Sequence, residues 1–299
     1  MHDKLEMLIA VAKEQHFGRA AASMGITQPT LSSGIKHLED QLGVQLVVRG
    51  SRYGGLTPEG QSALEWARRI IGDTRQLREE MRFKRHGLSG QLRIAAIPTA
   101  LTWAAKLAAV FGAKHPKVRF TILSRTSAEI LSMLENLDLD AGISYLDNEP
   151  MGRVSTEPLY VERYMLVCQA GSPLAKRKMM SWEEVGEERL CLLTPDMQNR
   201  RIIEKNLADA GVFGKAWIES NSTVVLVSTV ETGGWLTILP EELANFLTAG
   251  KPLALVPMAP QKTAYSVGLV APYREPHTPV LAELLREARR ISAIAGNQN

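Results

Sequence analysis

Hydroxyl, amide and amine side chains recur at helical spacing within the segment of residues 28–42. Hydroxyls and amides both donate and accept hydrogen bonds, and a lysine amine pairs with phosphate. On one slim helical face, this combination suits the base edges and phosphates of a DNA major groove. An ordinary helical hairpin with a solvated polar face would show the same spacing. The side chains concerned are Gln28, Pro29, Thr30, Ser32, Ser33 and Lys36.

The same segment has an apolar face that would hold it against a protein core. Large apolar residues recur at intervals of four, three and four, which makes one stripe of a helix. They are Leu31, Ile35, Leu38 and Leu42. An alanine-rich helix precedes it, and Gly25 supplies the turn because glycine takes a positive φ without strain. Thr27 is the expected N-cap and Pro29 falls in the first turn, so the pattern predicts a helix-turn-helix.

Two flanking segments complete this predicted domain. Residues 4–14 are amphipathic, and their apolar side would pack behind the helix pair. In residues 44–55, apolar side chains first occupy alternate positions and glycines then allow the chain to turn. This pattern predicts a short β-hairpin, or wing. Arg49 and Arg52 would project from this wing and suit phosphate or minor-groove contact, although a solvated turn is the alternative. The alternating residues are Val44, Leu46 and Val48.

A long helix is predicted from Thr57, its N-cap, to about Phe83. Small and apolar residues recur at alternating spacings of four and three over roughly 40 Å, as in the seam of a coiled coil. A stripe of this length needs a partner, so we predict a homodimer formed through it. Packing against the protein's own second domain is the alternative. The seam residues are Ala63, Ala67, Ile70, Thr74, Leu77 and Met81.

Composition restricts the class of protein. The 299 residues are 45% hydrophobic, enough for two or three domains with cores. Cys168 and Cys191 form no CxxC pair, which disfavours a disulfide scaffold and a zinc module. The N-terminus lacks a signal-peptide pattern and no apolar run suits a membrane span, so we expect a cytoplasmic protein with no membrane partner. Residues 1–90 hold thirteen Lys or Arg and ten Asp or Glu, which equals the whole net charge of +3.

From Gln91 onward the sequence alternates between strand and helix patterns. Such alternation predicts parallel strands with covering helices. The pattern restarts after Pro158, so we expect two α/β lobes with a cleft between them and crossovers near residues 145–159 and 260–263. The strands are expected near residues 92–97, 118–123, 141–144, 164–168, 190–194, 217–219, 236–239, 253–256 and 265–271. The helices are expected near residues 100–114, 127–137, 197–210, 222–230, 241–246 and 280–294.

Hydroxyl side chains mark a candidate ligand site in this part of the chain. In open α/β sheets, ligands bind where strands end and helices begin, beside free N–H groups that suit an anion. Capping of the helices is the alternative for each threonine, because Ser and Thr are common N-caps. We expect a small, anionic metabolite as effector. The candidate residues are Pro98, Thr99, Ala100, Thr126, Tyr145, Thr194 and Asn221.

These motifs together resemble the LysR-type transcriptional regulators over essentially the whole chain. The specific part is FGRAAASMGITQPTLSSGIKHLEDQLGVQLVVR followed by LTPEG. It carries the family's Gln-Pro-x-Leu-Ser core, Ile-x-x-Leu-Glu continuation and Leu-Thr-x-x-Gly start of a linker helix. One departure is Ser33, which stands where the family often has arginine, so a contact made by that arginine would have to come from another residue.

The resemblance implies an α/β fold with three parts. These are a winged helix-turn-helix at residues 1–57, a linker helix at 58–84 and, after a hinge at 85–90, an effector-binding domain at 91–299. This last domain would be two-lobed, like type II periplasmic binding proteins, with lobe I at about 91–160 and 266–299 and lobe II at about 161–265. Gln28, Thr30, Ser32 and Ser33 would face base edges, Pro29 the DNA backbone or a thymine methyl, Lys36 a base or phosphate, and Arg49 and Arg52 the flanking backbone.

The implied function is transcriptional regulation at inverted-repeat sites by a homodimer or homotetramer. The implied partners are double-stranded DNA, a small-molecule effector and RNA polymerase. The sequence lacks the common hydrolase, metalloprotease and nucleotide-binding motifs, so we predict no enzyme, no catalytic or metal-binding residue and no cofactor beyond the effector. A cytoplasmic small-molecule-binding protein without sequence-specific DNA function is the alternative.

Overall fold

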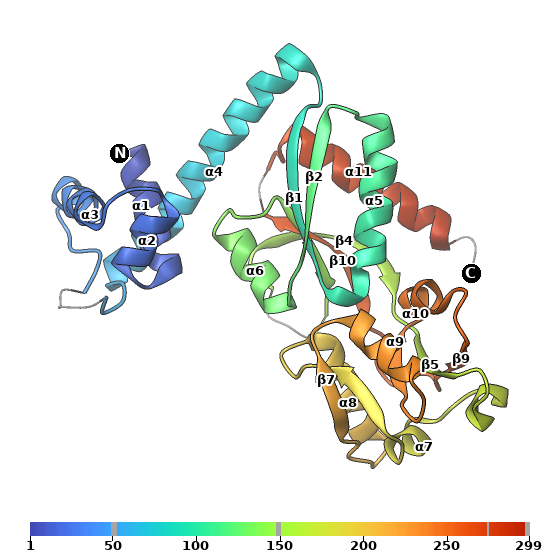
Figure 1. The fold of residues 1–299 in the computed structure, drawn as a ribbon. Coiled ribbons are helices and arrows are strands. Elements are labelled where there is room, and N and C mark those ends of the chain that lie inside the picture. Colours follow the sequence, from blue (N-terminus) through green and yellow to red (C-terminus); the bar gives the residue numbers. More distant parts are fainter. Residues whose placement is uncertain (49–52, 148–150, 274, 297–299) are drawn as a thin grey trace. The chain divides into compact units, whose positions relative to one another are not determined.

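The computed structural model describes residues 1–48, 53–147, 151–273 and 275–296 (Figure 1). Contacts within the chain divide it into two units, of which the first includes Met1–Gly87 and the second most residues from Leu88 onward. Within the described ranges, no helix is both long and apolar enough to cross a membrane.

The described part of the first unit contains four helices around one small core. α1, α2 and α3 pack against one another, and α1 also packs on α4. Leu8, Val11, Ala20, Leu31 and Leu38 are wholly buried in this core. The predicted three-helix core is therefore confirmed. The helices are α1 (His2–Glu14), α2 (Phe17–Ser23), α3 (Gln28–Leu42) and α4 (Pro58–His86).

Local sequence signals set the ends of these helices. Gly25 has a φ of 67°, so the predicted turn between α2 and α3 is confirmed. The Thr27 hydroxyl accepts a hydrogen bond from the Thr30 N–H at 3.4 Å, which caps α3 as predicted. His16 caps α2 through Nδ1, which accepts from the N–H groups of Gly18 and Arg19. This last cap was not predicted, because histidine is not a common N-cap.

The wing is less regular than predicted. Within the described residues, its strands pair only through a single bridge between Val47 and Leu56. Leu46 and Val47 are both buried, whereas Val44 and Val48 are exposed, so the predicted alternation was wrong. The Glu39 carboxylate of α3 accepts hydrogen bonds from the N–H groups of Leu46 and Val47, which tie this segment to α3. The predicted contact residues Arg49 and Arg52 lie outside the described residues.

α4 presents two different faces. Leu64, Ala67 and Ile71 are buried in the core of the first unit, whereas Ile70, Leu77 and Met81 of the predicted seam are exposed. Ala67 was therefore placed wrongly in the seam, because the start of α4 turns that side toward α1. Trp66 is 57% exposed next to it and was missed. Leu42 of α3 also differs from the prediction, since it is 43% exposed at the end of its helix.

The second unit contains a five-stranded sheet in the order β2-β1-β3-β10-β4. β1 pairs in parallel with β2 and β3, as predicted, and β10 runs antiparallel between β3 and β4. β4 was not predicted, because its segment was expected to be a crossover between the lobes; the structure corrects this. The strands are β1 (Gly90–Ala96), β2 (Val118–Ser124), β3 (Ala141–Tyr145), β4 (Val154–Val161) and β10 (Ser266–Pro272). The associated helices are α5 (Leu101–Lys114), α6 (Ser127–Glu135) and α11 (Pro279–Gly296).

The remaining elements form a second lobe. An antiparallel sheet in the order β8-β5-β9 lies beside the parallel pair β6 and β7. Val167, Cys191, Leu226 and Val230 are buried in its core. The helix α7 has only five residues and was not predicted. The strands are β5 (Tyr164–Gln169), β6 (Leu190–Leu193), β7 (Ala216–Ser220), β8 (Thr237–Pro240) and β9 (Leu253–Pro257). The helices are α7 (Trp182–Gly186), α8 (Gln198–Asp209), α9 (Thr223–Glu231) and α10 (Glu241–Thr248).

Candidate nucleic-acid interface and ligand cavity

The outer face of α3 carries the six residues predicted there, five of them polar. Leu31, Ile35 and Leu38 are buried on the opposite side of the helix. The outer face is exposed along its length and begins at the capped N-terminus of α3. It is therefore free to enter a groove without disturbing the core. Its residues are Gln28, Pro29, Thr30, Ser32, Ser33 and Lys36.

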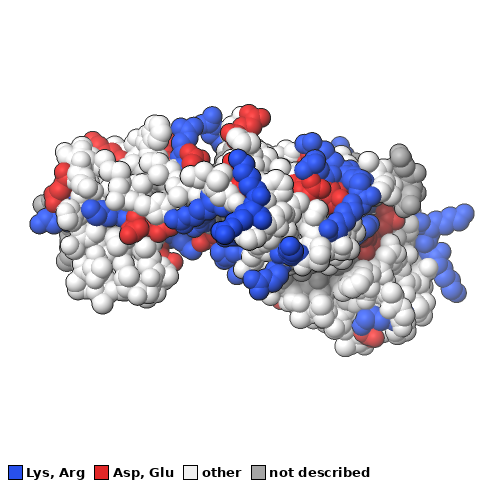
Figure 2. Space-filling model, turned by 90° about the horizontal axis from the view of Figure 1, so that it is seen from above, with Lys and Arg blue, Asp and Glu red and all other residues white. Residues whose placement is uncertain are grey.

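Of the six residues of this face, only Lys36 carries a charge. On the face shown in Figure 2, Lys and Arg side chains are interspersed with Asp, Glu and uncharged residues. This distribution fits the small net charge of +3. Any affinity of this face for DNA would therefore depend on individually placed contacts more than on a broad basic surface.

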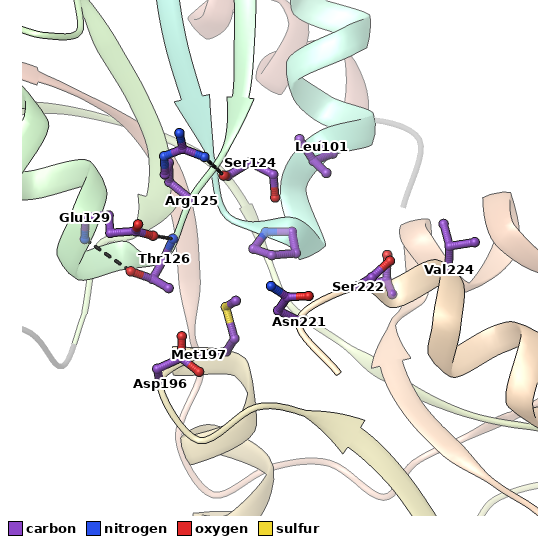
Figure 3. A pocket seen from close by; sticks show the side chains of 12 residues that line it. Leu101, Ser124, Arg125, Thr126, Glu129, Asp196, Met197, Asn221, Ser222 and Val224 are labelled. Carbon is purple, nitrogen blue, oxygen red and sulfur yellow. Dashed lines mark hydrogen bonds between the residues drawn. The ribbon is translucent and has the colours of Figure 1, made fainter. Parts of the chain in front are cut away.

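An outer cavity of about 640 Å³ lies between the two lobes of the second unit (Figure 3). It receives residues from the ends of β1 and β2 and from the segments that begin α6, α8 and α9. Met197 lies between Thr126 and Asn221 in the view of Figure 3. The lining consists of Pro98, Leu101, Ser124, Arg125, Thr126, Glu129, Asp196, Met197, Asn221, Ser222, Thr223 and Val224.

Thr126, which lines the outer cavity, is a capping residue. The Thr126 N–H donates to Glu129 Oε2 at 2.8 Å, and the Glu129 N–H donates to Thr126 Oγ1 at 3.2 Å. This reciprocal pair satisfies the first turn of α6. The Glu129 carboxylate consequently occupies the place at this helix N-terminus that an anionic ligand would otherwise take.

The charges on the outer cavity are mixed. Among the described residues of the lining, Arg125 supplies the one cation, and it donates from Nη1 to the Ser124 carbonyl oxygen at 2.7 Å. Glu129 and Asp196 supply two carboxylates. Ser222 stands at the N-cap position of α9 but makes no side-chain capping bond. The outer cavity can therefore offer both anion-binding and cation-binding groups to one ligand.

A smaller inner chamber of about 10 Å³ adjoins the outer cavity, since Pro98 and Met197 line both. Polar side chains from both lobes meet there, and several of their atoms are buried without a hydrogen-bond partner among the described residues. Such atoms are uncommon in folded proteins and call for an explanation. The chamber is lined by Ile97, Pro98, Thr99, Ser127, Tyr145, Leu193, Met197, Gln198 and Asn199.

A buried carboxylate lies next to the inner chamber. Tyr145 and Tyr164 each donate a hydrogen bond to Glu162 Oε2, at 2.9 and 2.5 Å. Burial raises the pKa of Glu162 from 4.5 to about 7, and the hydrogen bonds from the two tyrosines oppose this rise. Burial and the charge of Glu162 likewise raise the pKa of both tyrosines well above 10.

The structure separates the predicted effector residues into three groups. Pro98, Thr126 and Asn221 line the outer cavity, whereas Thr99 and Tyr145, together with Pro98, line the inner chamber. Ala100 is fully buried and Thr194 is half-buried, and neither belongs to either lining. Sequence reasoning missed several further lining residues, although their positions directly after a strand or at a helix start would have indicated them. The most polar of these are Arg125, Gln198 and Asn199.

Comparison with known protein families shows to which family this chain belongs. The model for the LysR substrate binding domain matches residues 85–292, and the model for the bacterial regulatory helix-turn-helix protein, lysR family, matches residues 2–61. The chain is a LysR-type transcriptional regulator. Regulators of this family have a helix-turn-helix and an effector-binding domain and are not enzymes.

Individual relatives agree with this assignment. The DNA-binding transcriptional dual regulator OxyR of Escherichia coli is 29% identical over 79% of this chain and 77% of its own. The regulator XapR of the same organism is 26% identical over 81% of this chain and 82% of its own. Among solved structures, full-length OxyR from Pseudomonas aeruginosa superimposes with a TM-score of 0.73 at 24% identity, covering 97% of both chains. The structure of CbnR in complex with its target DNA superimposes with a TM-score of 0.61 at 19% identity, covering 97% of this chain and 99% of the CbnR chain.

Proposed function

We propose that this LysR-type regulator reads inverted-repeat promoter sites with the outer face of α3. The observation that carries the proposal is the division of α3 into a buried apolar side and an exposed side of hydroxyls, amides and one lysine. Ser32, Ser33 and Lys36 can reach base edges or phosphates without any change in the core. The solved complex of CbnR with DNA supports the same use of this fold.

The second part of the proposal concerns assembly. Exposed apolar residues along α4 form a stripe that a second copy of the helix would cover, so we propose a homodimer through α4 and a homotetramer built from two such dimers. Leu77→Asp should give monomers in light scattering, whereas Leu77→Met should leave the assembly intact. Monomers already present in the wild-type protein would contradict this part. The stripe contains Trp66, Ile70, Leu77 and Met81.

The third part concerns the signal. A small metabolite with an anionic group would bind in the outer cavity, with its anion near Arg125 and the uncapped start of α9. Binding would favour one arrangement of the two lobes, and that preference would alter how the paired α3 helices sit on DNA. The family resemblance also suggests RNA polymerase as a partner of the DNA-bound form.

The test is a gel shift with DNA from beside the protein's own gene. The proposal predicts a shifted complex that an unlabelled copy of the same DNA displaces and a scrambled DNA of equal length does not. Ser32→Ala combined with Ser33→Ala should weaken this complex at unchanged melting temperature, because both side chains are exposed. Equal displacement by the scrambled DNA would favour the alternative, a small-molecule-binding protein without sequence-specific DNA function.

Some relatives carry the name of hydrogen peroxide-inducible genes activators, which suggests thiol oxidation as a second candidate signal. Peroxide reacts with an accessible thiolate. Here Cys168 and Cys191 are both buried. Burial raises the pKa of both thiols, that of Cys191 to about 11, and the Cys191 thiol donates to the Leu236 carbonyl oxygen at 3.3 Å. These thiols therefore do not favour peroxide sensing.

A further inference from the structure

The inner chamber contains more hydrogen-bond acceptors than donors. The hydroxyls of Thr99 and Ser127 and the amide oxygens of Gln198 and Asn199 have no partner among the described residues. All four side chains are at least 95% buried. Leaving buried polar groups unpaired is costly, so the chamber is complete only when something supplies hydrogens to them.

The orientation of the Gln198 amide is fixed by its neighbour. Gln198 Nε2 lies 3.1 Å from the carbonyl oxygen of Asp147, which can only accept a hydrogen bond. The NH₂ group must therefore point toward Asp147. Gln198 Oε1 is left as an acceptor without a partner.

The orientation of the Asn199 amide is fixed by a longer chain of hydrogen bonds. Glu162 Oε2 accepts from the hydroxyls of Tyr145 and Tyr164, so those hydroxyl oxygens must themselves accept from Asn199. Asn199 Nδ2 lies 3.4 Å from Tyr145 Oη and 3.2 Å from Tyr164 Oη. Asn199 Oδ1 is thereby left as a second fixed acceptor, and Glu162 acts as the positioning residue for it.

We infer that the inner chamber binds a protonated primary amino group at one end of the effector. This inference rests on the proposed function, because the effector must occupy the adjoining outer cavity. An ammonium group carries three N–H donors and no acceptor, which matches two fixed carbonyl acceptors and two adaptable hydroxyls. A carboxylate would place acceptor against acceptor there.

Size and charge agree with this inference. A volume of about 10 Å³ accommodates a single group of about the size of a water molecule, as an ammonium group is. The outer cavity brings the carboxylates of Glu129 and Asp196 against one cation, Arg125, so it favours a ligand that is not purely anionic. The effector class is thus an amino carboxylate, with its ammonium in the inner chamber and its carboxylate in the outer cavity.

The test compares the melting temperature of the full-length protein in methylammonium chloride and in tetramethylammonium chloride at equal concentration. The two cations have the same charge, but only methylammonium has N–H donors. Methylammonium at saturation should raise the melting temperature by about 2 °C or more over tetramethylammonium, as expected for ligand binding to the folded state. Equal melting temperatures in the two salts would overturn the inference.

Matched variants locate the effect. Thr99→Val removes one hydroxyl, and Gln198→Met removes the amide oxygen together with the nitrogen that donates to Asp147, each at nearly constant volume. Both variants should abolish most of the difference between the two salts. Thr237→Val removes a buried hydroxyl that lines neither cavity, so it should keep the difference. If Gln198→Met does not fold, Thr99→Val decides alone. A difference that persists in Thr99→Val would contradict the inference.

A second measurement separates this inference from the proposed function. L-amino acids are compared with the carboxylic acids that lack their amino group, by thermal melting and by their effect on the gel shift. We expect at least one amino acid to bind about tenfold more tightly than its desamino counterpart, since the chamber's acceptors would otherwise stay unpaired. If the desamino acids bind better, the inference fails while the effector cavity stands.

Discussion

The outer face of α3 and the inner chamber carry the same kinds of side chain in opposite environments. On α3 the hydroxyls, amide and amine are exposed and hydrated, and they come from a single helix. In the chamber the hydroxyls and amides are buried, lack partners, and come from both lobes. The exposed polar groups of α3 are satisfied by water when no DNA is bound, whereas the buried acceptors of the chamber stay unpaired until a donor group enters.

This difference predicts that mutations separate stability from binding on α3 and couple the two in the chamber. On α3, the residues that hold the helix and the residues that would read DNA lie on different sides. In the chamber, Asn199 belongs both to the lining and to the Glu162 network. A change there should therefore affect folding and ligand binding together.

The largest expected effect lies on the buried side of α3. Leu31→Ala should lower the free energy of unfolding by about 3 kcal/mol, because it leaves a cavity in a fully buried site. Ser32→Ala, on the exposed side, should change it by less than about 0.5 kcal/mol. Chemical denaturation followed by circular dichroism measures both. Similar losses for the two variants would break the proposed separation of the faces.

Next in size is the pH dependence of stability that arises from Glu162. Its pKa is higher in the folded state, at about 7, than the usual 4.5, so the unfolded chain releases this proton more readily. The contribution of Glu162 to stability is then fully present below pH 4.5 and is lost as the pH rises through 7. The loss is about 3 kcal/mol, since one pKa unit corresponds to about 1.4 kcal/mol. Glu162→Gln should remove this pH dependence, which thermal melting between pH 5 and 8 measures. Parallel curves of melting temperature against pH for the wild-type and variant proteins would contradict the burial of a titrating carboxyl.

Lys36 tests the exposed face with a smaller effect. Lys36→Ala should weaken DNA binding about tenfold and, if the amine contacts phosphate, lower the slope of log affinity against log salt by about one. Fluorescence anisotropy at several salt concentrations measures both quantities. Lys84→Ala near the far end of α4 is the matched control and should leave both unchanged. Wild-type affinity in Lys36→Ala would remove Lys36 from the interface.

Thr126 should give the smallest effect. Thr126→Ala removes the cap of α6 and should cost about 1 kcal/mol of stability. The effector response in a gel shift should weaken as well if the hydroxyl also contacts ligand, with DNA affinity nearly unchanged. A lowered melting temperature with an intact response would leave Thr126 as a capping residue alone.

The same contrast explains which features the sequence could predict. The two faces of α3, the caps at Thr27 and Thr57 and the strand-helix alternation depend on neighbouring residues, so periodicity and cap chemistry found them. β4 was missed because the segment was interpreted as a crossover between lobes, and its pairing with β10 joins residues more than 100 positions apart. The buried position of Ala67 depended on tertiary packing in the same way.

The cavity was predictable only in part. Pro98, Thr126 and Asn221 could be predicted because the end of a strand and the start of a helix can be recognised from neighbouring residues. Gln198 and Asn199 stand at the start of α8, which is a local signal, but their free acceptors arise only when Tyr145 and Asp147 meet them in the folded chain.

The central claim is that the exposed side of α3 recognises a particular DNA sequence. The most direct measurement is the affinity of the full-length protein for the DNA beside its own gene and for a scrambled duplex of equal length, at one salt concentration, by fluorescence anisotropy. The account predicts a ratio of about a thousandfold or more, which falls sharply when Ser32 and Ser33 are both replaced by alanine. Equal affinity of the wild-type protein for the two duplexes would contradict it.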